Sequence, residues 1–138
     1  MLDHIKQIQE GVHTAFIDGN MNSNLAYRPQ FISNNYKTGQ KVLSSIEEEL
    51  KNCDEFFISV AFITKGGITP LLQALKELEK RGIPGKILTT DYLTFSEPEA
   101  LKKLSNLKNI ELRMYRVNEN EAGFHTKGYI FKSAGFFY

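Results

Sequence analysis

The stretch EFFISVAFI, residues 55–63, is an almost unbroken apolar run of strand length. Such a run is typical of a strand that is covered on both faces, as the strands of parallel sheets are. Further strands are predicted over 85–92, over 109–117 and around His125, and helical patterns precede and separate the first three strands. This alternation predicts an α/β fold, with a layered, mixed and mostly parallel sheet that is flanked by helices.

The predicted helices carry start and stop signals. Thr38 is placed to cap a helix over 39–53, and Thr69, followed by proline, is placed to cap a helix that ends near Gly82. The segment SEPE, residues 96–99, matches a capping box at the start of the next helix.

Length, composition and charge indicate one domain without a strong electrostatic signature. The chain has 138 residues and a net charge of +1, so we expect a single domain in which 1–35 form an N-terminal helix and extended arm and 36–138 form the α/β core. The single cysteine, Cys53, excludes an internal disulfide and a Cys-based zinc site, and we expect it to be a small buried residue. No apolar run approaches the roughly 20 residues of a membrane span, and no signal peptide is evident, which predicts a cytoplasmic protein without a membrane partner.

The stretch AGFHTKGYIF, residues 122–131, carries the clearest chemical signal. His125 and Lys127 are two positions apart in a strand-like run, so their side chains are expected on the same side of the sheet. Histidine can act as a nucleophile, and a neighbouring ammonium holds the anionic oxygens of a phosphodiester. The pair therefore indicates a phosphate site, with a purely structural pair as the alternative.

Other candidate residues follow the predicted strands at their carboxyl ends, where α/β sheets place their sites. Thr89 and Asp91 end the second strand, and Asp91 is either a turn residue or a carboxylate that orients a base. The segment TKGG, residues 64–67, is either an anion seat at a helix N-terminus or a tight turn. His4 and His13 are expected on the surface of the N-terminal helix, and their spacing predicts no metal site.

These segments resemble the phospholipase D superfamily, whose signature is H-x-K-x4-D. The match is His125-Thr126-Lys127. The ordered set of the apolar strand, TTDY and FHTKGYIF resembles, more narrowly, the phospholipase-D-like domain at the N-terminus of bacterial DEAD/DEAH-type helicases linked to restriction or DNA repair. The likeness covers residues 36–132.

The resemblance implies a phosphodiesterase or nuclease that acts on DNA without metal or cofactor. A histidine attacks phosphorus to give a phosphohistidine, a second histidine protonates the leaving oxygen, and water completes hydrolysis. Each His-x-Lys copy supplies half a site, so a chain with one segment of this type implies a homodimer, with a helicase domain as a further partner in the full-length protein. His125 and Lys127 are then catalytic, and Lys127, Thr89, Asp91 and Lys132 form the predicted substrate-binding set.

Two features depart from the family pattern. The aspartate of the signature would fall at position 132, where the chain has Lys132, and the family's G-S-x-N segment is not reached before Tyr138. The closing stretch SAGFFY reads as a strand cut short, so we expect a fragment of a longer protein. Lys132 would add positive potential toward DNA.

Two other functions compete with the nuclease hypothesis. The first is a non-catalytic DNA-binding module that presents Lys127, Lys132 and the TKGG turn to the DNA backbone, with salt-dependent binding. The second is hydrolysis or transfer on a lipid or another small phosphodiester. It ranks last because the sequence has no amphipathic basic helix for a membrane surface.

Overall fold

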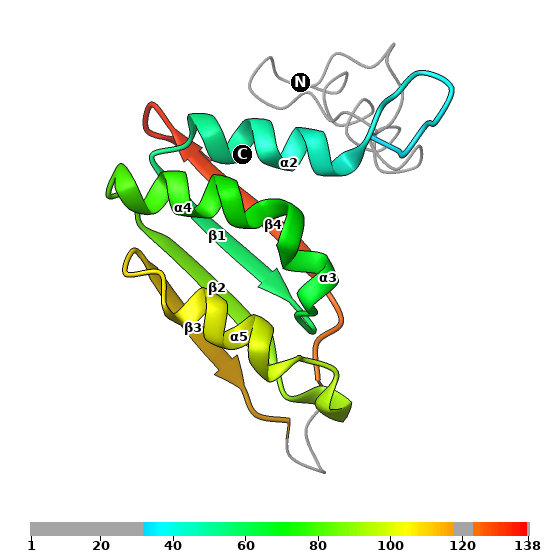
Figure 1. Cartoon of the computed structure of the whole chain (residues 1–138), viewed down its shortest axis with the longest axis vertical. Coiled ribbons are helices and arrows are strands. Elements are labelled where there is room, and N and C mark those ends of the chain that lie inside the picture. The colour runs from blue at the N-terminus through cyan, green and yellow to red at the C-terminus, as the bar shows by residue number, and fades with distance from the viewer. Residues whose placement is uncertain (1–31, 118–122, 138) are drawn as a thin grey trace, which may run out of the picture. The chain divides into compact units, whose positions relative to one another are not determined.

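A mixed β-sheet with helices packed against one face forms the α/β core of the chain (Figure 1). The computed structural model describes residues 32–117 and 123–137. Contacts divide the chain into two units, residues 1–42 and 43–138, and the sheet belongs to the second. The described elements are α2 (Val42–Asn52), β1 (Glu55–Val60), α3 (Lys65–Ile68), a 3-10 helix (Thr69–Leu71), α4 (Leu72–Lys80), β2 (Gly85–Thr90), a 3-10 helix (Tyr92–Thr94), α5 (Pro98–Ser105), β3 (Ile110–Tyr115), β4 (Lys127–Ser133) and β5 (Phe136–Phe137).

The strands lie in the order β3-β2-β1-β4-β5. The first three strands are parallel, with Ile58 opposite Ile87 and Ile87 opposite Leu112. Strand β4 runs antiparallel to β1, with Phe131 opposite Phe56, and β5 runs antiparallel to β4. The predicted parallel arrangement therefore holds for β1 to β3 only. The chain between β3 and β4 is shorter than the dozen or so residues that a parallel crossover needs, so β4 returns in the opposite direction.

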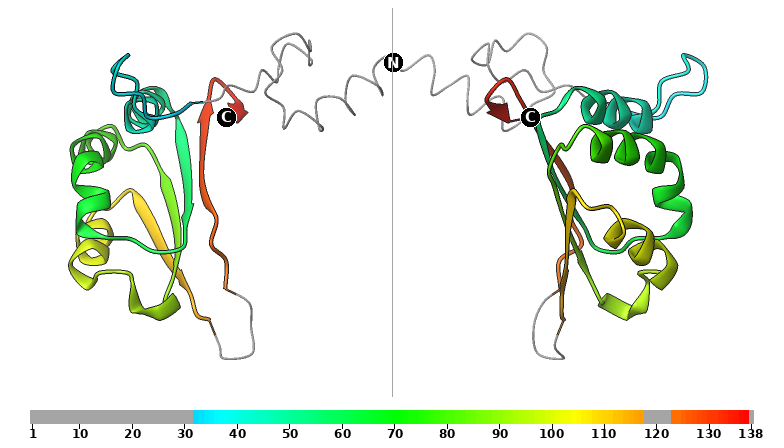
Figure 2. Two further views of the ribbon diagram at one scale, coloured as in Figure 1. Left: turned by 90° about the vertical axis from the view of Figure 1, so that its right-hand side faces the viewer. Right: turned by 60° about the vertical axis from the view of Figure 1, so that its left-hand side comes forward.

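Helices α2, α4 and α5 all cover the same face of the sheet (Figure 2). Alternate strand side chains, such as Phe56 and Ile58 of β1, point toward them and are buried. The largest part of this core comes from the following residues: Leu50, Phe56, Ile58, Leu75, Leu78, Ile87, Leu104, Ile110 and Phe131. Burial of these apolar side chains is the main favourable contribution to folding.

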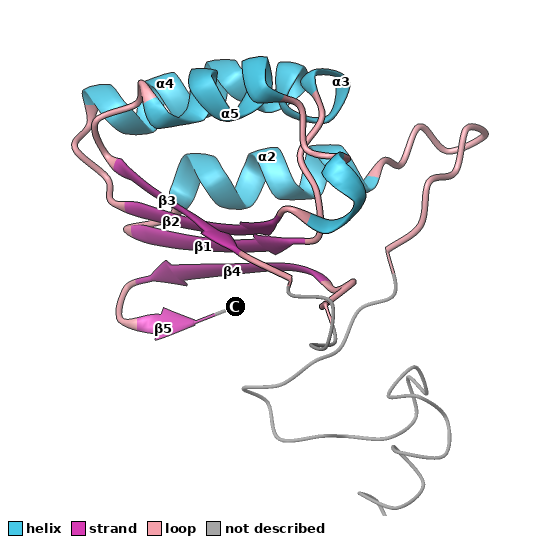
Figure 3. Ribbon diagram, turned by 90° about the horizontal axis from the view of Figure 1, so that it is seen from below, coloured by secondary structure: helices cyan, strands magenta, loops and turns pink. Residues whose placement is uncertain are grey.

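The opposite face of the sheet carries no helix in the part of the chain that the structure describes (Figure 3). Phe57 of β1 is half-buried there, and Leu88 and Ile130 are 37% and 48% exposed. The strand at 55–63 is predicted to be covered on both faces. Within residues 32–117 and 123–137 this prediction is wrong, because no described helix covers the second face.

The predicted caps Thr38, Thr69 and Ser96 do not cap the helices that follow them. The helical segment before Gly82 begins at Lys65, where Thr64 is the N-cap and its hydroxyl accepts from the N–H of Gly67 at 3.1 Å. Thr69 lies inside this segment and its hydroxyl donates to the carbonyl of Lys65. Gly82 ends α4 with a φ of +69°, as predicted.

Thr38 does not cap α2 either. The helix begins at Val42, whose N–H donates to the side-chain oxygen of Asn34 at 3.0 Å. Thr38 lies in the turn between Asn35 and Gln40. The predicted N-terminal helix and extended arm, residues 1–35, lie almost wholly outside the described residues.

Ser96 is a buried structural residue instead of a helix cap. Helix α5 begins after Glu97. The Ser96 hydroxyl accepts from the N–H of Ile63 at 3.2 Å and donates to the carbonyl of Thr90 at 3.2 Å. It thereby joins the segment after β1 to the end of β2.

Replacing Ser96 with alanine should lower the free energy of unfolding by about 1–3 kcal/mol, because two buried backbone groups lose their partner. Urea denaturation measures the change. Ser105→Ala is the matched control, since the Ser105 hydroxyl donates to the Lys102 carbonyl at an exposed site, and should change stability by less than about 0.5 kcal/mol. Equal effects of the two substitutions would contradict the structural role of Ser96.

Cys53 is fully buried, as predicted. Its thiol lies 3.3 Å from the Leu50 carbonyl, and burial raises the pKa of the thiol. The thiolate is the nucleophilic form of cysteine, and the raised pKa disfavours it. Cys53 is therefore a packing residue of the core. None of the helices in the described ranges has the length and apolar character that a membrane crossing needs.

Candidate functional site: the carboxyl edge of the sheet

The His-Lys pair lies at the edge where the three parallel strands end. Strand β4 begins at this edge because it is antiparallel to β1, so Lys127 at its start is opposite Val60 at the end of β1. His125 precedes β4 and is not part of the strand. The topology therefore carries this pair to the position where α/β sheets place their sites.

The side chains of His125 and Lys127 are in contact and exposed. Lys127 Nζ lies 3.4 Å from His125 Nε2, and both residues are accessible to solvent. The donor and acceptor roles in this contact depend on which ring nitrogen of His125 carries the proton. The structure brings the two groups together as their spacing predicts.

Phe62 positions both members of the pair. Its ring centroid lies 6.1 Å from that of His125, and Lys127 Nζ lies 5.7 Å from the Phe62 centroid. A cation over an aromatic face is attracted by the ring quadrupole, which favours this placement of the ammonium. Phe62 was not identified from sequence because it reads as the end of the apolar strand.

Asp91 lies at the same edge but has a structural partner. Its carboxylate accepts from the N–H of Val117 at 2.8 Å, and its own N–H donates to the carbonyl of Tyr115 at 3.3 Å. These bonds tie the end of β2 to the end of β3. Among the described residues, no carboxylate hydrogen-bonds to His125.

Thr89 does not face the open edge. Its side chain is fully buried on the helix-covered face, and its hydroxyl lies 3.4 Å from the Ser96 hydroxyl. A substrate-binding role does not fit this placement, because a phosphate has no access to a group inside the core. The correction follows from strand parity, since Thr89 is two positions from the buried Ile87.

Lys132 is separated from the His-Lys pair along β4. It lies opposite Glu55 at the start of β1, and the two charged groups are 3.8 Å apart. It is also five positions from Lys127, so it points to the other face of the sheet. The predicted set of substrate-binding residues is therefore not assembled in one place.

The TKGG turn is already occupied by an anion of the protein itself. The N–H of Lys65 donates to the carboxylate of Glu97 at 2.6 Å, and Lys65 Nζ lies 3.0 Å from the carboxylate of Glu99. The hydrogen bond between the side chains of Lys65 and Glu99 raises the pKa of Lys65 and lowers the pKa of Glu99. The tight-turn interpretation fits this geometry, and the anion-seat interpretation does not.

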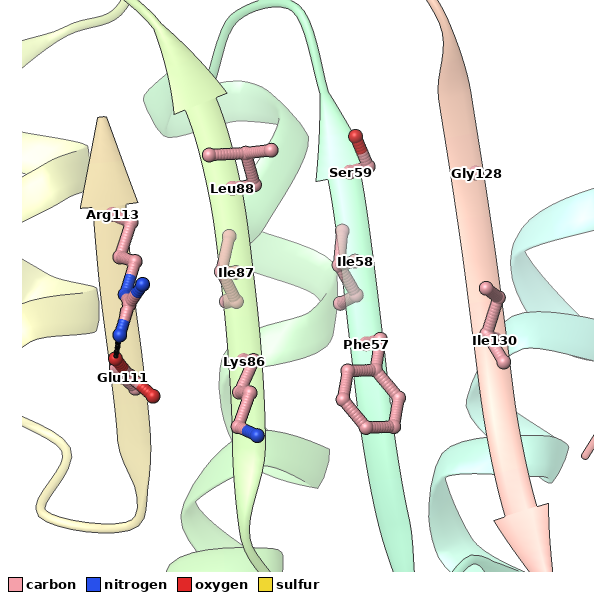
Figure 4. Close-up of a pocket in the computed structure, with 10 residues that line it drawn as sticks. All are labelled: Phe57, Ile58, Ser59, Lys86, Ile87, Leu88, Glu111, Arg113, Gly128 and Ile130. Atoms are coloured by element: carbon pink, nitrogen blue, oxygen red, sulfur yellow. Dashed lines mark hydrogen bonds and ion pairs between the residues drawn. The ribbon is translucent and has the colours of Figure 1, made fainter. Parts of the chain in front are cut away.

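A shallow hollow of about 400 Å³ lies on the helix-free face (Figure 4). Phe57, Lys86, Leu88, Arg113 and Ile130 are among its lining residues, and His125 and Lys127 are not. Its charged groups have internal partners, since Arg113 pairs with Glu111 and Lys86 Nζ lies 5.4 Å from the Phe57 ring centroid. The hollow is therefore distinct from the His-Lys pair.

A second His-x-Lys triplet occurs at His4-Ile5-Lys6, outside the described residues, so the expectation that the chain has one such segment is wrong. Its spacing falls in the predicted N-terminal helix, where side chains two apart do not share a face. In the described part of the chain, no group of three or more His, Cys, Asp or Glu residues is arranged to hold a metal ion.

No family model fits the chain, and no curated protein is significantly similar to it in sequence.

Proposed function

We propose that the chain is a phosphodiesterase domain of the phospholipase D type that acts on DNA. The observation that carries this proposal is the exposed contact between Lys127 Nζ and His125 Nε2, 3.4 Å apart, at the carboxyl edge of the sheet. A nucleophilic nitrogen beside a fixed ammonium is the arrangement that attack on an anionic phosphodiester needs. The resemblance to the nuclease domains of restriction or repair helicases supplies DNA as the substrate and a helicase domain as the partner.

The proposed reaction has two steps. In the first, the ring nitrogen of His125 forms a bond to phosphorus while the bond to the leaving oxygen breaks, and a second histidine gives that oxygen a proton. In the second, water gives its proton to that histidine and its oxygen bonds to phosphorus as the P–N bond breaks. The products are a phosphomonoester and an alcohol. Lys127 neutralises the non-bridging oxygens in both steps.

The second histidine is proposed to come from another copy of the chain. A two-fold axis near the carboxyl edge would bring two His125 side chains to one phosphate, because a symmetric interface presents the same surface from both partners. One His125 is then the nucleophile and the other the general acid.

A DNA-binding module without turnover is the second candidate function. It is favoured by the carboxylates of the edge, because Asp91 bonds to Val117 instead of His125 and position 132 holds a lysine. Lys127 would then contact a phosphate without chemistry following.

Metal dependence and covalent trapping distinguish these functions. With bis(p-nitrophenyl) phosphate or a DNA oligonucleotide as substrate, we expect hydrolysis that excess EDTA does not change. Rapid quenching should give an acid-labile, alkali-stable phosphoprotein. Salt-dependent DNA binding without product would support the binding module, and hydrolysis that stops with EDTA would overturn the proposed mechanism.

A further inference from the structure

Two exposed aromatic side chains lie at the same carboxyl edge as the His-Lys pair. Phe95 and Tyr92 are 51% and 41% exposed, and both belong to the turn that follows β2. The rings of Phe95 and Phe62 form an edge-to-face contact with a centroid distance of 5.7 Å, and Phe62 contacts both His125 and Lys127. A continuous row of rings therefore leads from solvent to the imidazole.

The backbone of this turn is held in a costly conformation that keeps the rings outside the core. Leu93 and Thr94 have φ values of +47° and +55°, in the left-handed region that non-glycine residues rarely adopt. Tyr92 N–H donates to the Thr90 hydroxyl, and Phe95 N–H donates to the Tyr92 carbonyl. A turn fixed in this way presents its aromatic side chains with little further loss of conformational entropy on binding.

We infer that this aromatic row is a stacking platform for unpaired nucleobases, so that the edge takes single-stranded nucleic acid in preference to duplex. The inference deepens the proposed function and rests on it for the phosphate position. Lys127 supplies the cation for the backbone, and Phe62 joins that cation to the exposed ring of Phe95. Cationic groups interleaved with aromatic rings are the general means of binding single strands, since every base has a face that can stack.

A duplex does not fit this surface as well, because its bases are already stacked on one another and offer only their edges in the grooves. The row of rings is thus matched to a flat, uncharged group that is covalently attached to a phosphodiester.

Binding is tested with His125→Ala protein, which holds substrate without turnover, by fluorescence anisotropy of one labelled oligonucleotide as single strand and as blunt duplex. Phe95→Leu and Tyr92→Leu keep apolar surface but remove the aromatic face. Each is expected to weaken single-strand binding about ten-fold and to leave duplex binding unchanged. Ile130→Ala, at a residue of similar exposure (48%) on the helix-free face, should change neither. Circular dichroism and the unfolding midpoint verify that each variant folds.

Equal losses on duplex and single strand, or no loss from either aromatic variant, would overturn the inference. Binding to phosphatidylcholine–phosphatidylglycerol vesicles would also overturn it if the Phe95→Leu variant still binds and the Phe95→Ala variant does not. Such a pattern requires an apolar side chain but no aromatic ring. Aromatic-dependent single-strand binding without cleavage would refute the proposed hydrolysis and leave the inference intact. Cleavage of single strand and duplex at equal rates, unchanged by Phe95→Leu, would refute the inference about single strands and leave the proposed hydrolysis intact.

Discussion

Replacing His125 with alanine should reduce phosphodiester hydrolysis by about 10⁴-fold or more, the scale seen when an enzyme loses its nucleophile. No described residue offers a substitute, since the side chains that contact His125 are the ammonium of Lys127 and the ring of Phe62. Neither of these can form the covalent intermediate. The rate of p-nitrophenol release from bis(p-nitrophenyl) phosphate measures the loss.

Lys127→Met should reduce the same rate by about 10²- to 10³-fold, because the charge that develops on the phosphate loses its nearest cation. Lys127→Arg keeps the charge but changes its geometry, so it should retain more activity than Lys127→Met. The second triplet provides matched controls, and His4→Ala and Lys6→Met should leave the rate unchanged. Loss of activity in His4→Ala with activity retained in His125→Ala would contradict the assignment.

The proposed dimer has its own signature in mixtures of wild-type and His125→Ala chains. If both histidines of a site come from different copies, activity depends on the square of the wild-type fraction after the subunits have exchanged. A linear dependence would show that one chain is sufficient and would refute the shared site.

The largest effect on stability is expected from Gly85→Ala, which should lower the free energy of unfolding by about 3 kcal/mol or more. Gly85 lies directly opposite Phe56 on the neighbouring strand, and a Cβ atom on it would overlap the Phe56 ring. Because Phe56 is fully buried in the core under the helices, its ring cannot move aside without displacing its neighbours. Urea denaturation followed by circular dichroism gives the value.

A double-mutant cycle separates this overlap from a general loss of backbone freedom. Phe56→Leu removes ring atoms, so the double variant should be more stable than the sum of the single changes predicts, by about 1–3 kcal/mol. Gly128→Ala is the control, because a Cβ at this strand glycine meets open space, and it should change stability by less than about 0.5 kcal/mol. Equal effects at both glycines would contradict the close packing of Phe56 over Gly85.

The order of strands and helices in the core could be predicted from sequence because it depends on local periodicity. The runs at 55–63, 85–92 and 109–117 contain β1, β2 and β3. The helix caps could not be predicted in this way. The Ser96 hydroxyl bonds to the N–H of Ile63, which only the tertiary fold brings near, and Thr69 lies inside a helical segment that already begins at Lys65. In the described residues, coverage of the sheet also differs from the prediction, because an apolar run does not reveal which layer lies over each face.

Only the contact between residues close in sequence could be predicted for the candidate site. The spacing of His125 and Lys127 was sufficient to predict their contact, because neighbours at i and i+2 need no tertiary information. Thr89 was misassigned although its parity with Ile87 already indicated the buried face. The contact of Phe95 with Phe62 joins separate connections, and no pattern within either segment indicates it.

The pairing of β4 with β1 also bears on how the chain folds. Lys127 pairs with Val60, residues far apart in sequence, and contacts of this kind form late because their loop-closure entropy must be overcome first. The parallel strands and their helices can associate before β4 joins them. Transient detachment of β4 would therefore carry His125 and Lys127 away from Phe62 while the rest of the core stays folded. Amide exchange in β4 should then be faster than in β1 and β2.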